Sequence, residues 1–178
     1  MLSETLRAII LLGVNLLVLV VLQELNYWLS PLSIYLYFPI LFVFYPALYL
    51  RLPCGLLCIL LTSLFFDASL MIPYGNTWSI LCVAYITIVL LDVILLRGRK
   101  SNIIILALIL NALAIMANTF LLYPPGQFSG AYFFRALEDL LASELFLGLA
   151  ILPYLKLQSS ILKQCNLPLT WKLVDNPS

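Results

Sequence analysis

The sequence predicts an all-α membrane protein with six transmembrane helices and with both termini in the cytoplasm. Three observations lead to this prediction: the composition, the spacing of the apolar segments and the distribution of the basic residues. Of the 178 residues, 64% are hydrophobic and 10% are charged, whereas soluble domains carry about 25% charged residues. A chain of this size cannot bury so much apolar surface within its own fold. We therefore expect lipid to surround most of it.

Six apolar segments approach the length of about 20 residues that a helix needs to cross the hydrocarbon core. We place these spans at residues 6–22, 33–50, 53–72, 77–96, 102–122 and 140–154. Prolines and glycines separate several of them, as in Pro73-Tyr-Gly75 and Pro124-Pro-Gly126, and such residues are typical of turns. We expect residues 131–139 to form a short amphipathic helix at the outer surface. Residues 1–178 show no internal repeat or linker, so they form one polytopic domain.

The basic residues orient the chain. With the N-terminus inside, only Arg135 falls on the outer side. The cytoplasmic segments then hold eight basic residues: Arg7, Arg51, Arg97, Arg99, Lys100, Lys156, Lys163 and Lys172. Short cytoplasmic loops carry an excess of Lys and Arg. An odd number of spans would scatter these charges over both sides, so the distribution favours six.

Two carboxyl groups lie within the predicted spans at a similar depth near the outer side. They are Asp67 in the third span and Glu144 in the sixth, and together with Arg135 they could line one polar pocket. Ionisable residues inside a membrane are costly and often mark function. Two interpretations stay open: a site for a cation, a proton or a substrate, and hydrogen bonding between helices with protonated carboxyls.

The remaining polar residues of the spans have simpler interpretations. Asp92 falls near the cytoplasmic end of the fourth span, where we expect it to reach water or the adjacent arginines. Asn111 and Asn118 are seven residues apart, so they share one face of the fifth helix. We expect both, together with Asn15, to hydrogen-bond neighbouring helices.

Several functional classes lack the residues that they need. The chain has no histidine, and we find no Ser-Lys pair, paired aspartates or phosphate-binding glycine loop at workable spacing. We therefore predict no enzymatic activity, no cofactor and no metal site. Cys54 and Cys58 lie one helical turn apart, and we interpret them as packing residues because free cysteine is often buried. A net charge of +1 lacks the concentrated basic face that nucleic-acid binding requires.

One stretch carries a more specific pattern. It comprises Pro39-x5-Tyr45, Leu52-Pro53-x-Gly55, Ser63-Leu-Phe-Phe-Asp67, Pro73-Tyr-Gly75 and Tyr85. This stretch resembles the rod shape-determining MreD family of small bacterial inner-membrane proteins. The hallmark of that family is a small residue four before an aspartate, with a turn glycine about eight after it. Asp67 and Gly75 match this offset, but the family usually has glycine where this chain has Ser63. The final helix with Pro153 and a basic tail also fits.

The resemblance implies a non-catalytic scaffold subunit of the bacterial cell-elongation machinery, which governs rod shape and peptidoglycan synthesis at the inner membrane. The implied partner is an MreC-like protein and, through it, MreB, RodA and a class B penicillin-binding protein. Asp67 would then be a structural or interface residue, and the outer face near Pro73 and Gly75 would contact a partner.

The six-helix arrangement also resembles the substrate-binding subunits of energy-coupling-factor vitamin transporters. The alternative function is therefore a substrate-binding membrane subunit of a vitamin or small-molecule uptake transporter. That family docks its transducer through small residues four apart on the first helix, which let two backbones approach closely. Here Ala8 and Gly13 are five apart, which favours the scaffold.

Overall fold

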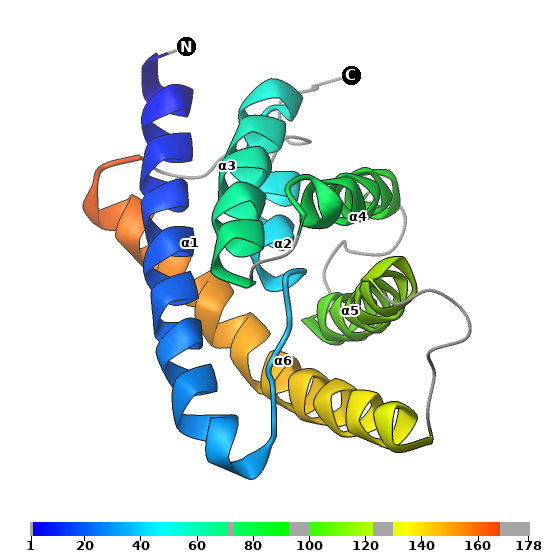
Figure 1. Cartoon of the computed structure of the whole chain (residues 1–178). Coiled ribbons are helices and arrows are strands. Elements are labelled where there is room, and N and C mark those ends of the chain that lie inside the picture. Colours follow the sequence, from blue (N-terminus) through cyan, green and yellow to red (C-terminus); the bar gives the residue numbers. More distant parts are fainter. Residues whose placement is uncertain (1, 71–72, 93–99, 123–129, 168–178) are drawn as a thin grey trace.

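The computed structural model describes residues 2–70, 73–92, 100–122 and 130–167, and every regular element in these ranges is helical. The elements are α1 (Leu2–Leu29), the 3-10 helix η1 (Ser30–Leu32), α2 (Leu41–Tyr49), α3 (Leu52–Leu70), α4 (Asn76–Asp92), α5 (Lys100–Leu122) and α6 (Gly130–Gln164). Figure 1 shows how they gather into one bundle. The predicted all-α class is therefore confirmed over the described ranges. Arg97, Arg99, Lys172 and Pro124–Gly126 lie outside them.

Four helical stretches in these ranges are long and apolar enough to cross a membrane: Glu4–Leu32, Leu52–Ser69, Ser101–Leu121 and Phe133–Gln164. The apolar part of α4, Asn76–Leu91, is shorter. The helix α2 has only nine residues, or about 14 Å at 1.5 Å per residue, which is less than half of a hydrocarbon core of about 30 Å. These lengths and this composition indicate a membrane protein.

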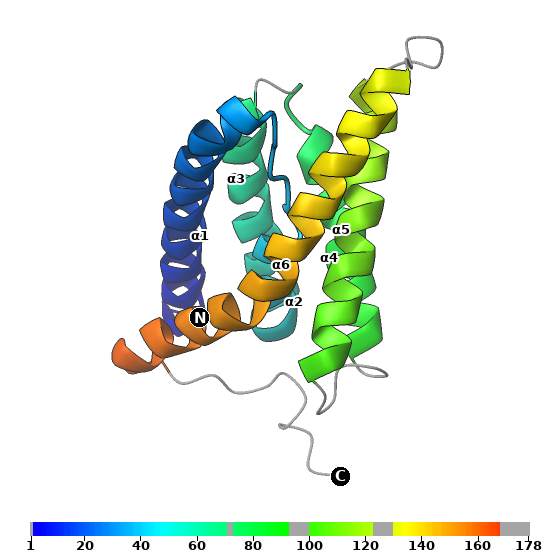
Figure 2. The same cartoon turned by 90° about the horizontal axis from the view of Figure 1, so that it is seen from below.

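The helices alternate in direction between two ends of the bundle. At one end, Arg51 forms an ion pair with Glu4 (Nε–Oε1 2.9 Å), and Leu162 near the end of α6 packs with Ala8 and Leu50. We call this the Arg51 end. At the other, the Asp67 end, α1 and α3 finish and α4 and α6 begin. Figure 2 shows the first turns of α1 and the last turns of α6 at the same end.

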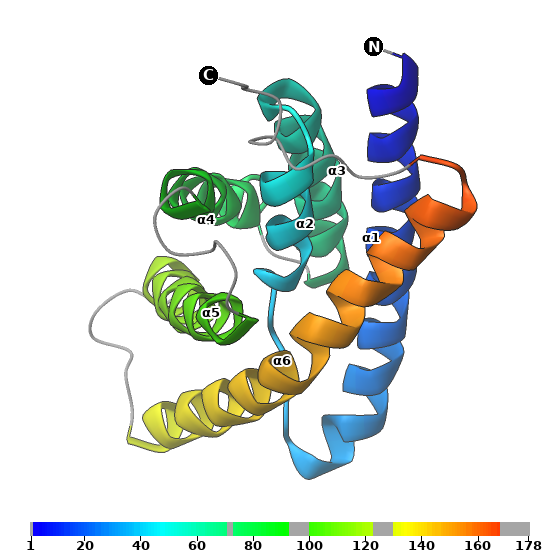
Figure 3. The same cartoon turned by 180° about the vertical axis from the view of Figure 1, so that it is seen from behind.

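The second predicted span, residues 33–50, differs from an uninterrupted helix. Residues 34–38 are extended, and α2 begins only at Leu41. Pro39 contributes to this break, because the residue before a proline is driven away from helical dihedral angles. The helix α2 is buried at every residue from Leu41 to Leu48 and packs mainly against α3 and α4. It therefore occupies the centre of the bundle (Figure 3).

The sixth predicted span needs a correction. The expected surface helix at residues 131–139 and the span at 140–154 form one continuous helix, α6, of 35 residues. Alanine, leucine and glutamate favour helix, and no glycine or proline interrupts residues 131–147. Pro153 lies inside α6, and beyond it the ribbon bends across the start of α1 (Figure 2). Proline removes one helical hydrogen bond and commonly causes such a bend.

Aromatic rings tie α2 to its neighbours. Phe42 of α2 makes edge-to-face contacts with Phe66 of α3, with ring centroids 5.9 Å apart, and with Tyr154 of α6 at 6.0 Å. Tyr37 of the preceding non-helical segment also makes an edge-to-face contact with Phe66, with ring centroids 5.4 Å apart. Such pairs contribute about 0.5–1.5 kcal/mol each beyond the area that they bury. They fix α2 and the extended segment at the level of the buried polar groups described next.

Candidate functional site

The extended segment, which we define as residues 34–38, obtains its hydrogen bonds from side chains. The backbone N–H of Leu36 donates to Oδ1 of Asn26 (2.8 Å), and Nδ2 of Asn26 donates to the carbonyl of Leu36 (3.0 Å). Asn26 therefore mimics a neighbouring β-strand. Non-helical backbone at membrane depth is tolerated only where protein satisfies its polar groups, and this reciprocal pair does so at the end of α1.

The helix α6 binds the residues on either side of Leu36. The N–H of Tyr35 donates to Oδ1 of Asp139 (2.7 Å), and the N–H of Tyr37 donates to Oγ of Ser143 (2.9 Å). Asp139 and Ser143 are four residues apart and share one helical face. Three consecutive backbone N–H groups are thus held by side chains from α1 and α6. The sequence interpretation missed Asn26, Asp139 and Ser143 as a group.

The helix α5 adds a contact through Asn111, which is fully buried. Its Nδ2 donates to Oε1 of Glu144 (3.0 Å) and makes a longer contact with the carbonyl of Tyr37 (3.4 Å). Asn111 therefore joins α5 to α6 and to the extended segment. This is the hydrogen bonding between helices that the sequence predicted for Asn111, and Glu144 is one of its partners.

Asp67 caps a helix. Its buried carboxyl accepts the N–H of Gly75 at Oδ2 (2.8 Å) and the N–H of Thr77 at Oδ1 (3.2 Å). The first N–H groups of a helix have no partner within the helix, and its N-terminus favours a negative charge. Gly75 has φ of +96°, a region that favours glycine. The spacing of eight between Asp67 and Gly75 thus joins the end of α3 to the start of α4.

Asp67 and Glu144 have different partners. Asp67 binds the start of α4, whereas Glu144 binds Asn111 of α5. Tyr37 lies between them, because its backbone contacts Ser143 and Asn111 while its buried hydroxyl lies near Thr77 and Asp67. Arg135 is exposed and lies near Asp139. The two predicted carboxyls therefore belong to one region around Tyr37, but each has its own hydrogen bonds.

The other predicted site residues are spread over the bundle. Ser63 is buried and donates to the carbonyl of Leu60 in its own helix (2.8 Å). Pro73 is exposed, and its carbonyl accepts the N–H of Asn76 (3.2 Å). Asn118 accepts a hydrogen bond from the Asn76 side chain and so joins α5 to α4. Asp92 ends α4, and its side chain lies outside the described part of the chain.

A second buried polar cluster centres on Asn15. Its Nδ2 donates to Oγ1 of Thr62 (3.2 Å), and its Oδ1 accepts from the Tyr154 hydroxyl and from Nε2 of Gln158 (3.0 Å). All four side chains are buried. The cluster joins α1, α3 and α6, in agreement with the predicted role of Asn15. Its partners could not be identified without contacts.

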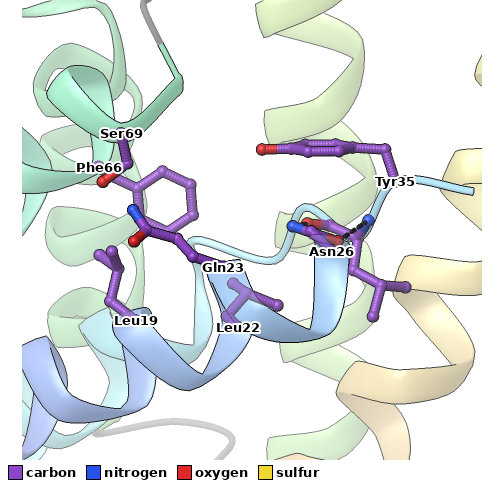
Figure 4. A pocket seen from close by; sticks show the side chains of 8 residues that line it. Leu19, Leu22, Gln23, Asn26, Tyr35, Phe66 and Ser69 are labelled. Carbon is purple, nitrogen blue, oxygen red and sulfur yellow. Dashed lines mark hydrogen bonds between the residues drawn. The ribbon is translucent and has the colours of Figure 1, made fainter. Parts of the chain in front are cut away.

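A small pocket opens beside the extended segment. Phe66 and Ser69 of α3 form one wall, and Asn26 and Tyr35 form the opposite wall (Figure 4). Its volume is about 10 Å³, which is room for roughly one water molecule. Pockets for small organic ligands measure about 300–1,000 Å³. In this conformation the pocket is therefore too small for a vitamin-sized molecule.

No group of three or more His, Cys, Asp or Glu side chains in the described ranges could hold a metal ion. All four cysteines are free thiols. Comparison with protein-family models, curated proteins and solved structures gives no match for the chain.

Proposed function

We propose that this chain is a non-catalytic scaffold subunit of the bacterial cell-elongation machinery, which directs peptidoglycan synthesis in rod-shaped cells. The observation that carries the proposal is the engagement of Asp67. This aspartate belongs to the stretch that resembles the MreD family, and both of its carboxyl oxygens accept backbone N–H groups at the start of α4. A carboxyl held in this way stabilises a turn. That structural role is the one expected of a scaffold.

In this proposal, the chain crosses the bacterial inner membrane six times and has both termini in the cytoplasm. The alternation of the helices supports six passes. The extended segment, at about 3.3 Å per residue, and α2, at about 1.5 Å per residue, together reach about 30 Å, which is the thickness of the hydrocarbon core. Among the described basic residues, Arg7, Arg51 and Lys163 lie toward the Arg51 end and Arg135 lies toward the Asp67 end. This distribution supports a cytoplasmic location for the Arg51 end.

The proposed partner is an MreC-like protein, which would link this chain to MreB, RodA and a penicillin-binding protein. The candidate contact is the turn at Pro73–Gly75. Pro73 is exposed, and Tyr74 is 73% exposed. Asp67 holds the turn by accepting the backbone N–H of Gly75. A turn that is held by hydrogen bonds to Asp67 and presents an exposed aromatic ring suits docking, because less conformational entropy is lost on binding.

Depletion of the protein in its host tests this function. Rods should become spheres within a few generations, and a plasmid copy of the wild-type gene should restore the rod shape. Co-purification with the MreC-like protein should be lost in a variant with Tyr74→Ala, and the exposed Tyr27→Ala provides a control at the same end of the bundle. Depleted cells that keep their rod shape at normal growth rates would disprove the proposal.

One observation favours the second candidate, a substrate-binding subunit of an uptake transporter. The second membrane segment is interrupted, and substrate sites in transporters are typically formed by discontinuous helices at their unwound backbone. The pocket of about 10 Å³ beside this backbone would have to enlarge to admit a substrate. Depleted cells that keep their shape but require an external vitamin would favour this second function.

A further inference from the structure

The Glu144–Asn111 pair has more hydrogen-bond acceptors than donors. Oε1 of Glu144 accepts the one N–H that Asn111 directs at it (3.0 Å). Oε2 of Glu144 and Oδ1 of Asn111 are both buried, and neither has a hydrogen-bond partner among the described residues. Asn111 is 0% exposed, so its oxygen cannot turn toward solvent. A buried polar atom without a partner is destabilising, and here two such atoms belong to side chains that touch.

Among the described residues, the interaction partners of the pair include no cation. Asn111 is the residue of α5 that interacts with the Glu144 carboxyl, and the extended segment contributes only the carbonyl of Tyr37, a further acceptor. On α6, Asp139 is engaged by the N–H of Tyr35, and Arg135 is exposed near Asp139. Asp67 is occupied by the N–H groups of α4. An ionised Glu144 would therefore be a partly buried charge with one neutral donor, which is unfavourable inside a membrane.

A single proton resolves both deficits. A protonated carboxyl has one O–H donor and one remaining acceptor oxygen, and a carboxamide has a complementary N–H donor and C=O acceptor. The two groups form a cyclic pair with two antiparallel hydrogen bonds. The bond from Nδ2 of Asn111 to Oε1 of Glu144 is one half of such a ring. The missing half is an O–H on Oε2 that donates to Oδ1, and these are the two atoms without partners.

We propose that Glu144 and Asn111 form a buried proton-binding site, in which the proton resides on Oε2 of Glu144 and is shared with Oδ1 of Asn111. The proton also fixes the orientation of the Asn111 amide. Because that amide contacts the Tyr37 carbonyl as well, the protonated pair fastens α5 and α6 to the extended segment. The inference concerns the Glu144–Asn111 pair and is independent of the scaffold function.

Infrared spectroscopy of the full chain in lipid nanodiscs tests the site. The difference between wild type and Glu144→Gln at neutral pH should contain the C=O stretch of a protonated carboxylic acid, which deuterium oxide shifts. The variant should lose this band and keep its melting temperature, because glutamine supplies an N–H in place of the O–H. Asp67→Asn is the matched control. It should retain the band, since Asp67 binds the start of α4 whereas Glu144 binds Asn111 of α5.

Three results would overturn the proposal. The first is a difference spectrum that contains only carboxylate bands. The second is a melting temperature that rises with sodium chloride but not with choline chloride, which would assign a sodium ion to the pair. The third result concerns the variant Asn111→Ala, which also provides a test if the Glu144→Gln protein does not accumulate in the membrane. The acid band should then persist but move to higher frequency, and a band that stays in place would show that Asn111 does not share the proton.

Discussion

Gly55 of α3 lies directly against the ring of Tyr85 of α4. A Cβ atom at residue 55 would lie 2.5 Å from the Tyr85 hydroxyl oxygen and 3.0 Å from two ring carbons. Tyr85 is 1% exposed, so its ring cannot move freely away. Both residues belong to the sequence pattern that runs from Pro39 to Tyr85. Their contact gives a physical reason for the glycine at residue 55, since small residues let two apolar helices approach closely.

Gly55→Ala should destabilise the protein because the added methyl group meets this ring. Overpacking of a buried contact costs about 1–3 kcal/mol, measured as a lower melting temperature in detergent or nanodiscs. Gly148→Ala is the matched control, because its Cβ would lie 3.9 Å from Leu108, an ordinary contact. A Gly55→Ala variant as stable as Gly148→Ala would show that α3 and α4 are not so closely packed.

The hydroxyl of Tyr85 provides an independent test of the same contact. It is buried and has no hydrogen-bond partner within the described ranges, so Tyr85→Phe alone should leave stability unchanged or slightly higher. Combined with Gly55→Ala, it removes the atom at 2.5 Å and should restore part of the lost melting temperature. The ring carbons at 3.0 Å remain, so we expect partial rescue. Strict additivity of the two changes would contradict a direct contact.

Asp67→Asn should weaken the link between α3 and α4 without preventing membrane insertion. Asparagine keeps one acceptor oxygen, so one of the two capped N–H groups of α4 loses its partner. Replacing a capping residue by alanine costs about 0.5–2 kcal/mol, and Asp67→Ala should therefore be less stable than Asp67→Asn. Ser63→Ala is the control, because the hydrogen bond of the Ser63 hydroxyl, among the described residues, is to Leu60 in its own helix. Complete loss of function with normal stability, abundance and partner binding would instead assign Asp67 a chemical role.

Hydropathy alone predicted most of the helices, because helices in lipid consist of long apolar runs bounded by turn residues. It could not predict the extended segment. Residues 34–50 are apolar almost throughout, and such a run does not distinguish a strand from a helix by periodicity. The extended backbone is stable because Asn26, Asp139 and Ser143 satisfy it, and two of these lie about a hundred positions away. Only contacts reveal that arrangement.

The same limit applies to the candidate site. The sequence placed Asp67 and Glu144 at one depth, and the structure places both around Tyr37. Depth does not determine which helices face each other, however. The sequence therefore could not predict that Asp67 caps Gly75 and Thr77 or that Glu144 pairs with Asn111. The continuous helix α6 was missed for a different reason. The charged residues Arg135, Glu138 and Asp139 suggested a separate surface helix. They lie in the first turns of α6 instead.

Asn26→Leu should destabilise the extended segment. The change removes the partners of both the N–H and the carbonyl of Leu36, and each unsatisfied buried group costs about 1–3 kcal/mol. Asn26→Asp should also be destabilising, because its second oxygen would face the Leu36 carbonyl. Gln23→Leu, at an exposed position one turn earlier, is the control. The measurement is hydrogen exchange of the amides of residues 35–37, which should accelerate in the Asn26 variants and not in the control.

Cysteine labelling should determine the orientation of the two ends. Cys165 is exposed just beyond α6 at the Arg51 end, and Tyr74 is exposed at the Asp67 end. In a variant whose other three cysteines are replaced by alanine, a membrane-impermeant maleimide should label Cys165 only after the cells are permeabilised. Tyr74→Cys, introduced with Cys165→Ser, should be labelled in intact cells. The prediction follows from the basic residues at the Arg51 end, since positively charged loops stay in the cytoplasm. The opposite pattern would invert the proposed topology, and labelling of both positions from outside would rule out an odd number of crossings between them.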